Sequence, residues 1–328
     1  MNPPLLALDH FGLDLRVDGT LQTVVHDVSL TIEAGQAVAL VGESGSGKSL
    51  TARAVIGLLP HGARARGSLL IDGVPLPPPR STALRRLRAT EIAMIFQDPR
   101  AHINPVRSVG DFLTEGLIRT RGVRRADATA TAIKLLDEVG IHDAARRMRQ
   151  HPHELSGGLL QRVMIAAALA AEPKLLLADE PTTALDVTTQ AEVMAIIDEA
   201  RAGRGLAMLF ISHDLQLAAA VCDRVAVMYA GSLVEELPAE RLHSASTHPY
   251  TRALLASRPA LGERGELHAI AGRPLSGFEV GDGCAFADRC PRARDRCRVE
   301  RPTPTPMGDS LTACFFPHVP ESRQASRG

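Results

Sequence analysis

A glycine-rich segment at residues 42–49 has the residue types and spacing of a phosphate-binding loop. It reads GESGSGKS, follows the apolar run 37–41 and precedes residues 50–59, which predict a helix. Glycines allow consecutive backbone N–H groups to turn toward phosphate oxygens, and the start of the helix adds a positive dipole end. The phosphate-binding residues predicted by this pattern are Gly42, Ser44, Gly45, Gly47, Lys48 and Ser49.

Two side chains at the end of this loop have separate chemical uses. The ammonium group of Lys48 would neutralise the β- and γ-phosphates, and the hydroxyl of Ser49 would bind Mg²⁺. A chance glycine-rich turn would lack the matching strand and helix on either side. The pattern therefore predicts a nucleoside triphosphate site.

A second apolar run, residues 175–178, leads directly into two carboxylates, Asp179 and Glu180. A carboxylate at this point can complete a Mg²⁺ shell, and the next one can polarise an attacking water. We predict that Asp179 binds Mg²⁺ and that Glu180 is the catalytic base. The alternative, a solvated strand end, fits poorly with an apolar run that passes straight into Asp-Glu-Pro-Thr.

Between these motifs lies LSGGLLQR, residues 155–162, which resembles the signature motif of ATP-binding cassette ATPases. The resemblance implies that Ser156 and Gly158 open a helix whose N-terminus faces the γ-phosphate bound by an opposite subunit. Hydrolysis would then require a dimer. Leu159 replaces the glutamine of the commonest version, a departure often shared by peptide importers of this class.

Three further positions match functional residues of the same family. Gln97 in IFQDP would contact the metal and water, Asp186 in ALD would lie at the dimer interface, and His213 in ISHD would contact the γ-phosphate. The resemblance thus implies catalytic roles for Lys48, Gln97, Glu180 and His213, ATP contacts from Ser156, Gly158 and Asp186, and Mg²⁺ binding by Ser49, Gln97 and Asp179.

The adenine site is the weakest part of the pattern. Family members usually stack adenine on an aromatic residue about two dozen positions before the loop, but residues 13–18 contain none. Phe11 lies too far upstream. Either Val17 makes an apolar contact with the base or another residue fills this role.

The family resemblance implies an α/β fold, with a RecA-like core, an antiparallel β subdomain and a helical insert at about 98–158. It places the nucleotide-binding domain at 1–240 and a small C-terminal extension at 241–328. A chromosome-structure or repair ATPase would need a long coiled coil between the two motifs, and only 106 residues separate Ser49 from Ser156.

Composition limits the possible partners and location. Basic and acidic residues balance at 37 each, aromatic residues make up 3% and tryptophan is absent, so we expect no nucleic-acid partner. Apolar runs such as 163–171 reach only about half of the roughly 20 residues that a spanning helix needs. The first residues lack a basic, export-type leader. We expect a cytosolic chain that reaches the membrane through other subunits.

The C-terminal part indicates the branch of the family. HPYT at residues 248–251, a cysteine-rich segment from 283, and FQDP followed by NPV near residue 104 resemble oligopeptide and dipeptide importer ATPases. This resemblance covers essentially the whole chain. It implies a peripheral subunit on the cytoplasmic face of the bacterial inner membrane.

Four cysteines follow in this C-terminal part with the spacing C-x₅-C-x₆-C-x₁₆-C. Disulfides are disfavoured in the cytosol, so the candidates are a [4Fe–4S] cluster, a structural Zn²⁺ or reduced thiols without metal. Because zinc sites more often contain closely spaced cysteine pairs, the spacing favours iron–sulfur. Nearby arginines would offset the thiolate charge or form a solvated loop; Cys222 is expected in the core. The predicted cluster ligands are Cys284, Cys290, Cys297 and Cys314, and the nearby arginines are Arg289, Arg292, Arg294 and Arg296.

The expected function is hydrolysis of Mg-ATP to power the import of di- or oligopeptides. The implied partners are two membrane permeases, a second ATPase that is a related but different chain, and an extracytoplasmic solute-binding protein. Similar ATPases serve nickel or glutathione-type cargo, and a soluble cassette ATPase without a transport role is a further alternative. The intact Lys48, Glu180 and His213 argue against a non-hydrolysing regulatory subunit.

Overall fold

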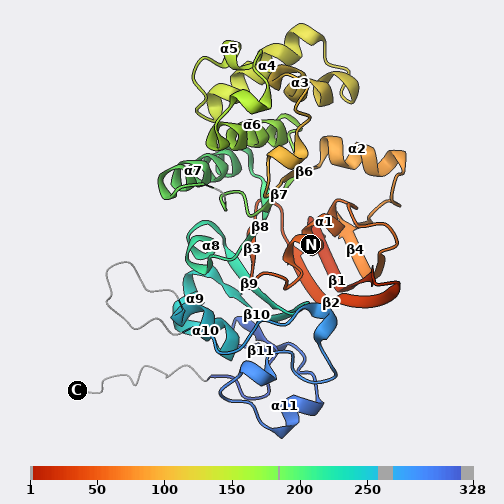
Figure 1. Ribbon diagram of the computed structural model, residues 1–328, viewed down its shortest axis with the longest axis vertical. Coiled ribbons are helices and arrows are strands. Elements are labelled where there is room, and N and C mark those ends of the chain that lie inside the picture. Colours follow the sequence, from red (N-terminus) through yellow and green to blue (C-terminus); the bar gives the residue numbers. More distant parts are fainter. Residues whose placement is uncertain (1–2, 184, 258–268, 319–328) are drawn as a thin grey trace, which may run out of the picture.

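The computed structural model describes residues 3–183, 185–257 and 269–318 (Figure 1). Its centre is a parallel sheet in which neighbouring strands run in the order β9-β3-β8-β7-β6. Nearly all residues of these strands are buried, as expected for a parallel sheet covered on both faces. The strands are β3 (Ala37–Val41), β6 (Ile92–Ile95), β7 (Leu175–Asp179), β8 (Ala207–Ser212) and β9 (Arg224–Tyr229).

The N-terminal strands form an antiparallel part of the sheet, as the family resemblance implied. Strand β1 pairs with β2 and β4, and β5 extends this edge. Asp18 and Gly19, both with positive φ, make the tight turn between the first two strands. Strand β2 therefore begins at Thr20, directly after this turn. The bounds are β1 (Leu6–Val17), β2 (Thr20–Ile32), β4 (Arg64–Ile71) and β5 (Val74–Pro75).

Helices α3 to α6 gather at one end of the molecule, above α7 and strands β6 and β7 (Figure 1). Helix α4 lies within the helical insert expected at about 98–158, and the signature segment opens α6. The helix after the phosphate loop ends before residue 59 because Gly57 adopts a positive φ. The helices are α1 (Lys48–Val55), α2 (Thr82–Thr90), α3 (Val109–Arg119), α4 (Arg125–Glu138), α5 (Ala144–Arg147), α6 (Gly157–Ala170), α7 (Val187–Arg204) and α8 (Leu215–Val221), with 3₁₀ turns η1 (Arg100–His102) and η2 (Pro152–Glu154).

The C-terminal residues are joined to the main sheet. Strand β12 pairs with β10, which itself pairs with β9, so the sheet continues into the C-terminal region. Short elements complete this region at the opposite end from α3 to α6 (Figure 1). They are β10 (Ser232–Pro238), η3 (Ala239–Arg241), α9 (Leu242–Ala245), α10 (Pro249–Ala256), η4 (Gly277–Glu279), η5 (Ala287–Arg289), α11 (Asp295–Val299), β11 (Thr305–Met307) and β12 (Ser310–Thr312).

A buried carboxyl group on β10 reinforces this junction. Glu235 is 2% exposed, and its Oε1 accepts hydrogen bonds from the backbone N–H groups of Thr247 and His248 at 2.6 and 3.0 Å. The hydroxyls of Thr247 and Thr312 also lie within hydrogen-bonding distance of this oxygen, at 2.8 and 3.4 Å. One side chain thus connects β10 to α10 and to β12. In the described parts of the chain, no helix combines the length and apolarity needed to cross a membrane.

Candidate active site

The phosphate loop connects β3 to α1 and holds its lysine in a buried position. Lys48 is 5% exposed, and its Nζ donates hydrogen bonds to the carbonyl oxygens of Gly42 and Glu43 at 2.8 and 2.9 Å. Burial lowers the pKa of Lys48, while the nearby carboxylates of Glu180, Asp179 and Glu43 act in the opposite direction. The ammonium group is therefore held inside the loop, where it can exchange carbonyl oxygens for phosphate oxygens.

Glycine is required at two places in this loop. Gly47, the residue before α1, has φ of 101°, a value that favours glycine. At Gly42, with φ of 151°, an added Cβ would lie 2.0 Å from the carbonyl oxygen of Met228 on β9. The loop consequently packs closely against β9, and larger residues at these positions would push it away from the phosphate-binding conformation.

The two residues predicted to bind Mg²⁺ through oxygen lie together. The Oγ of Ser49 donates a 2.7 Å hydrogen bond to Oδ1 of Asp179, across 130 residues of sequence. Asp179 is 1% exposed, and its other oxygen, Oδ2, is buried without a hydrogen-bond partner among the described residues. Burial raises the pKa of Asp179, and the hydrogen bond from Ser49 opposes this effect. A hard divalent cation would satisfy the unpaired oxygen, so the pair fits Mg²⁺.

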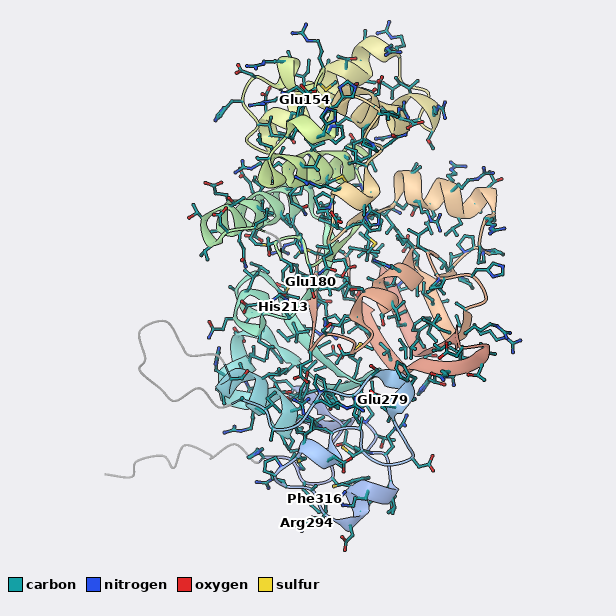
Figure 2. The ribbon with its side chains drawn as sticks, in the orientation of Figure 1. Glu154, Glu180, His213, Glu279, Arg294 and Phe316 are labelled. Atoms are coloured by element: carbon teal, nitrogen blue, oxygen red, sulfur yellow. The ribbon has the colours of Figure 1, made fainter. Side chains whose placement is uncertain are left out.

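The predicted base lies beside the two residues expected to assist it. Oε2 of Glu180 accepts hydrogen bonds from Nε2 of Gln97 at 3.0 Å and from the hydroxyl of Thr183 at 2.7 Å. Nδ1 of His213 lies 3.6 Å from the same oxygen, and Figure 2 shows Glu180 and His213 close together near the middle of the molecule. Glu180 also has φ of 46°, an uncommon value for a residue other than glycine. The ends of β6, β7 and β8 thus bring together three residues that are far apart in sequence.

The signature serine and the residue expected at the dimer interface are both exposed helix caps. Ser156 is exposed and caps α6, its Oγ accepting a 3.3 Å hydrogen bond from the N–H of Leu159. Asp186 is also exposed and caps α7 through Thr189, whose backbone and hydroxyl hydrogen bonds lower the pKa of Asp186. These capping hydrogen bonds lie within the helices that the two residues begin. Their action on a nucleotide held by another subunit stays a prediction.

The residues considered for adenine binding differ in accessibility. Phe11 is 2% exposed and belongs to the hydrophobic core beneath the antiparallel strands, so its ring is not free to stack on a base. Val17 is the last residue of β1 and is half-buried next to the Asp18–Gly19 turn. Val17 remains the more accessible of the two.

The four C-terminal cysteines line a single small pocket together with His248 and Phe286. Burial, followed by the proximity of the other three thiols, raises the pKa of Cys284 to about 11. Within the ranges that the structure describes, however, no three His, Cys, Asp or Glu residues are arranged to hold a metal ion. The predicted metal centre is therefore not supported by the geometry. Cys222 lies in the core as predicted, and burial raises its pKa to about 12.

The arginines near these cysteines have mostly other partners. Burial raises the pKa values of Cys290 and Cys314, and the charge of Arg292 opposes this effect. Arg294 lies over the ring of Phe316 at 4.2 Å from the ring centre, and both appear together in Figure 2. Arg296 covers the ring of Phe315 and forms an ion pair with Glu300, while Arg289 pairs with Glu43 in the phosphate loop. The sequence did not reveal this last contact, which joins residues 246 positions apart.

These features define a P-loop ATPase of the ATP-binding cassette class, and comparison with known proteins agrees. Family models for the ABC transporter and for the oligopeptide/dipeptide transporter C-terminal region match residues 25–183 and 234–297. The ATP-binding cassette MJ0796, in a dimeric post-hydrolysis state bound to ADP and Pi, matches with a TM-score of 0.64 and 26% identity, over 72% of this chain and 99% of that chain. The cbiO1 protein from Clostridium perfringens matches with a TM-score of 0.62 and 25% identity, over 74% and 90%.

Relatives with full-length similarity specify the branch. The oligopeptide transport ATP-binding protein OppD of Salmonella typhimurium is 43% identical over 93% of this chain and 92% of its own length. Its counterparts in Haemophilus influenzae and Escherichia coli are 40% and 42% identical, covering 95% and 93% of this chain and 97% and 92% of theirs. The chain belongs to the family of oligopeptide transport ATP-binding proteins.

Proposed function

We propose that this chain hydrolyses Mg-ATP to drive oligopeptide import across the bacterial cytoplasmic membrane. The observation that carries the proposal is the convergence of Gln97, Glu180 and His213 beside the Ser49–Asp179 pair, in a chain of the oligopeptide transport family. Nickel or glutathione-type cargo is the alternative. The family names favour oligopeptides, because all three relatives described above carry that description.

In this mechanism the chain mainly positions groups and stabilises charge. Lys48 moves from the carbonyl oxygens of Gly42 and Glu43 to the β- and γ-phosphates. The backbone N–H groups of the loop donate hydrogen bonds to the oxygens of these phosphates. Glu180 accepts a proton from the attacking water. Gln97 and His213 orient that water and the carboxylate, since both lie beside Oε2 of Glu180.

Mg²⁺ would be held by Ser49, Asp179 and Gln97. When bound, the ion would neutralise the charge that develops on the phosphate oxygens. The free Oδ2 of Asp179 is the feature that supports this assignment. The amide nitrogen of Gln97 donates a hydrogen bond to Glu180, so the amide oxygen of Gln97 could bind the metal ion.

The exposed caps at Ser156 and Asp186 support a head-to-tail pair of ATPases. In that pair, the N-terminus of α6 faces the γ-phosphate on the opposite subunit, with Gly158 beside it. Two permeases would dock near Gln97 and follow the closure of the pair. The other partners in this proposal are a related second ATPase chain and an extracytoplasmic solute-binding protein. The chain would lie peripherally at the cytoplasmic face of the membrane. Its domains would be 1–240, with a helical part at about 98–158, and 241–328.

A transport assay tests this proposal. We expect the assembled transporter in proteoliposomes to take up a labelled oligopeptide only with ATP, and Lys48→Ala to abolish uptake. Because the change removes a charge-assisted contact to the phosphates, the Kd for Mg-ATP should rise about 100-fold or more. Lys134→Ala, which removes an exposed lysine from α4, is the matched control. Uptake of nickel or glutathione without oligopeptide uptake would show that the transporter imports the alternative cargo and not oligopeptides.

We also propose that Cys284, Cys290, Cys297 and Cys314 hold a [4Fe–4S] cluster. The support is that the four thiols line one small pocket, although no three His, Cys, Asp or Glu side chains in the described ranges are already arranged around a metal ion. Protein purified without oxygen should show a broad band near 400 nm and about four irons per chain. Cys290→Ala should lose both signals, whereas Cys222→Ala should keep them. Stoichiometric zinc, or thiols without metal, would contradict the cluster.

A further inference from the structure

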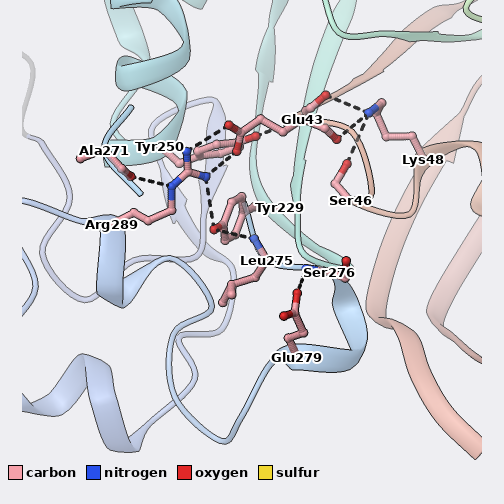
Figure 3. Close-up of polar contacts among 11 residues, drawn as sticks. Glu43, Ser46, Lys48, Tyr229, Tyr250, Ala271, Leu275, Ser276, Glu279 and Arg289 are labelled. Atoms are coloured by element: carbon pink, nitrogen blue, oxygen red, sulfur yellow. Dashed lines mark hydrogen bonds and ion pairs between the residues drawn. The ribbon is translucent and has the colours of Figure 1, made fainter. Parts of the chain in front are cut away.

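The phosphate loop is held from outside by the C-terminal region at Glu43 (Figure 3). The guanidinium of Arg289 binds the Glu43 carboxylate with two hydrogen bonds, Nη1 to Oε2 at 2.6 Å and Nη2 to Oε1 at 3.1 Å. The backbone N–H of Glu43 donates to the hydroxyl of Tyr250 at 2.9 Å. Both the side chain and the backbone of one loop residue are thus fixed by residues that follow β10.

The arginine is itself held rigidly. Its side chain is 5% exposed, its Nε donates to the carbonyl oxygen of Ala271 at 2.9 Å, and its Nη1 lies 3.4 Å from the hydroxyl of Tyr229. The rings of Tyr229 and Phe286 lie 5.7 and 5.9 Å from its guanidinium carbon. The Glu43 side chain is 22% exposed, so the pair is largely shielded from water, and a shielded bidentate pair with fixed partners restricts motion far more than an exposed ion pair does.

Glu43 also binds the catalytic lysine, Lys48. Its carbonyl oxygen accepts one of the hydrogen bonds from Nζ of Lys48, and its backbone N–H is the group held by Tyr250. A displacement of residue 43 would therefore move the carbonyl oxygen that places the ammonium group. Figure 3 shows the continuous path from Arg289 through Glu43 to Lys48.

A second segment of the C-terminal region lies against the same loop. The N–H of Leu275 lies 3.4 Å from the hydroxyl of Tyr229, and a Cβ added at Gly45 would lie 3.7 Å from Oγ of Ser276. His26 on β2 hydrogen-bonds through Nε2 to the carbonyl oxygen of Gly277 at 2.7 Å. The C-terminal region thus packs against one side of the loop through several contacts.

We propose that Arg289 is a positioning residue for ATP binding, which keeps the phosphate loop in its nucleotide-ready conformation by clamping Glu43. The inference rests on the proposed role of Lys48 and the loop. In this role Arg289 acts through Glu43, which it binds directly. Because Arg289 lies between Cys284 and Cys290, the clamp also links the four-cysteine pocket to the ATP site.

The test is Arg289→Met in the full-length chain. Without the clamp, only a fraction of molecules would hold the loop ready, and the apparent Kd is the intrinsic Kd divided by that fraction. We expect the Kd and KM for Mg-ATP to rise about 10-fold, while kcat of the assembled transporter at saturating ATP changes by less than about 2-fold. Titration calorimetry and steady-state hydrolysis measure the two quantities.

Companion variants separate positioning from general damage. Arg289→Lys should recover part of the affinity, and Glu43→Met combined with Arg289→Met should bind ATP more tightly than Arg289→Met alone, because no buried carboxylate is left unpaired. Arg298→Met, which removes an exposed ion pair with Asp288 in the same region, should leave the Kd unchanged. The Tm of each variant is measured, and Kd values are compared only among variants whose Tm matches that of the native chain.

The outcomes distinguish this inference from the proposed function. An unchanged Kd in Arg289→Met, with Lys48→Ala still unable to bind ATP, would overturn the clamp and leave the ATP site standing. A fall in kcat at unchanged Kd would also overturn it, because a loop-ordering role acts on binding. Normal ATP binding by Lys48→Ala would instead reject the proposed site.

Discussion

Replacement of Glu180 by Gln is expected to lower ATP turnover by about 100-fold or more while ATP binding stays intact. The amide of glutamine has nearly the same shape as the carboxylate but cannot accept the proton of the attacking water, and loss of a general base costs about 10²–10⁴-fold in rate. The carboxylate lies next to Gln97 and His213, so few other groups at this site can replace it.

The measurement is single-turnover hydrolysis by the assembled transporter, together with the Kd for Mg-ATP. Separated from the permeases, the variant ATPase subunits should also accumulate as an ATP-bound closed dimer, visible as a shift in size-exclusion chromatography. Glu192→Gln is the matched control, because Glu192 is an exposed carboxylate on α7 paired with Arg162. Near-normal turnover of Glu180→Gln would exclude Glu180 as the base.

Much of this site could be predicted from sequence because its residues lie at the ends of apolar runs. The runs 37–41 and 175–178 are buried strands, and the loop and carboxylates follow them directly. Parallel strands of one sheet end at the same edge, so motifs separated by more than 100 residues meet there. The 2.7 Å contact between Ser49 and Asp179 is the clearest result of this rule.

The clamp on the loop could not be predicted in the same way. Arg289 is one of several arginines in a loop-rich segment, and its partner depends on how that segment packs against β9 and the loop. Tyr250 belongs to the HPYT motif, so a signal for its importance was present, but not its contact with Glu43. Contacts between irregular segments depend on tertiary packing, for which sequence periodicity carries no information.

The solvent exposure of aromatic rings could not be predicted from the sequence either. Phe11 is the aromatic residue that lies upstream of the expected adenine position. Its ring turns into the core because the register of β1 shifts between Leu8 and Phe11, where His10 has a positive φ. Similarly, the sequence placed four arginines near the thiols, but the structure directs Arg294 and Arg296 to the rings of Phe316 and Phe315. In both cases the residue type was known and its neighbours were not.

The second large effect is expected for Ser156→Arg, which should act on the opposite subunit's nucleotide. Ser156 is exposed at the N-terminus of α6, whereas Lys48 and Glu180 are held by a separate set of contacts around the strand ends. The Kd for Mg-ATP of the single chain should therefore change by less than about 2-fold. Turnover of the assembled pair should fall about 10²–10³-fold, because the arginine displaces the helix end that stabilises the γ-phosphate during reaction.

A matched variant separates this effect from simple loss of a helix cap. Ser81→Arg alters the serine that caps α2 through the N–H of Leu84, and it should leave turnover within about 2-fold of the native value. Combining Ser156→Arg with Lys48→Ala in this chain should impair both nucleotide sites of the pair, one through each change. If Ser156→Arg weakened ATP binding by the isolated chain as strongly as Lys48→Ala does, α6 would act within its own subunit, and the head-to-tail arrangement would have to be abandoned.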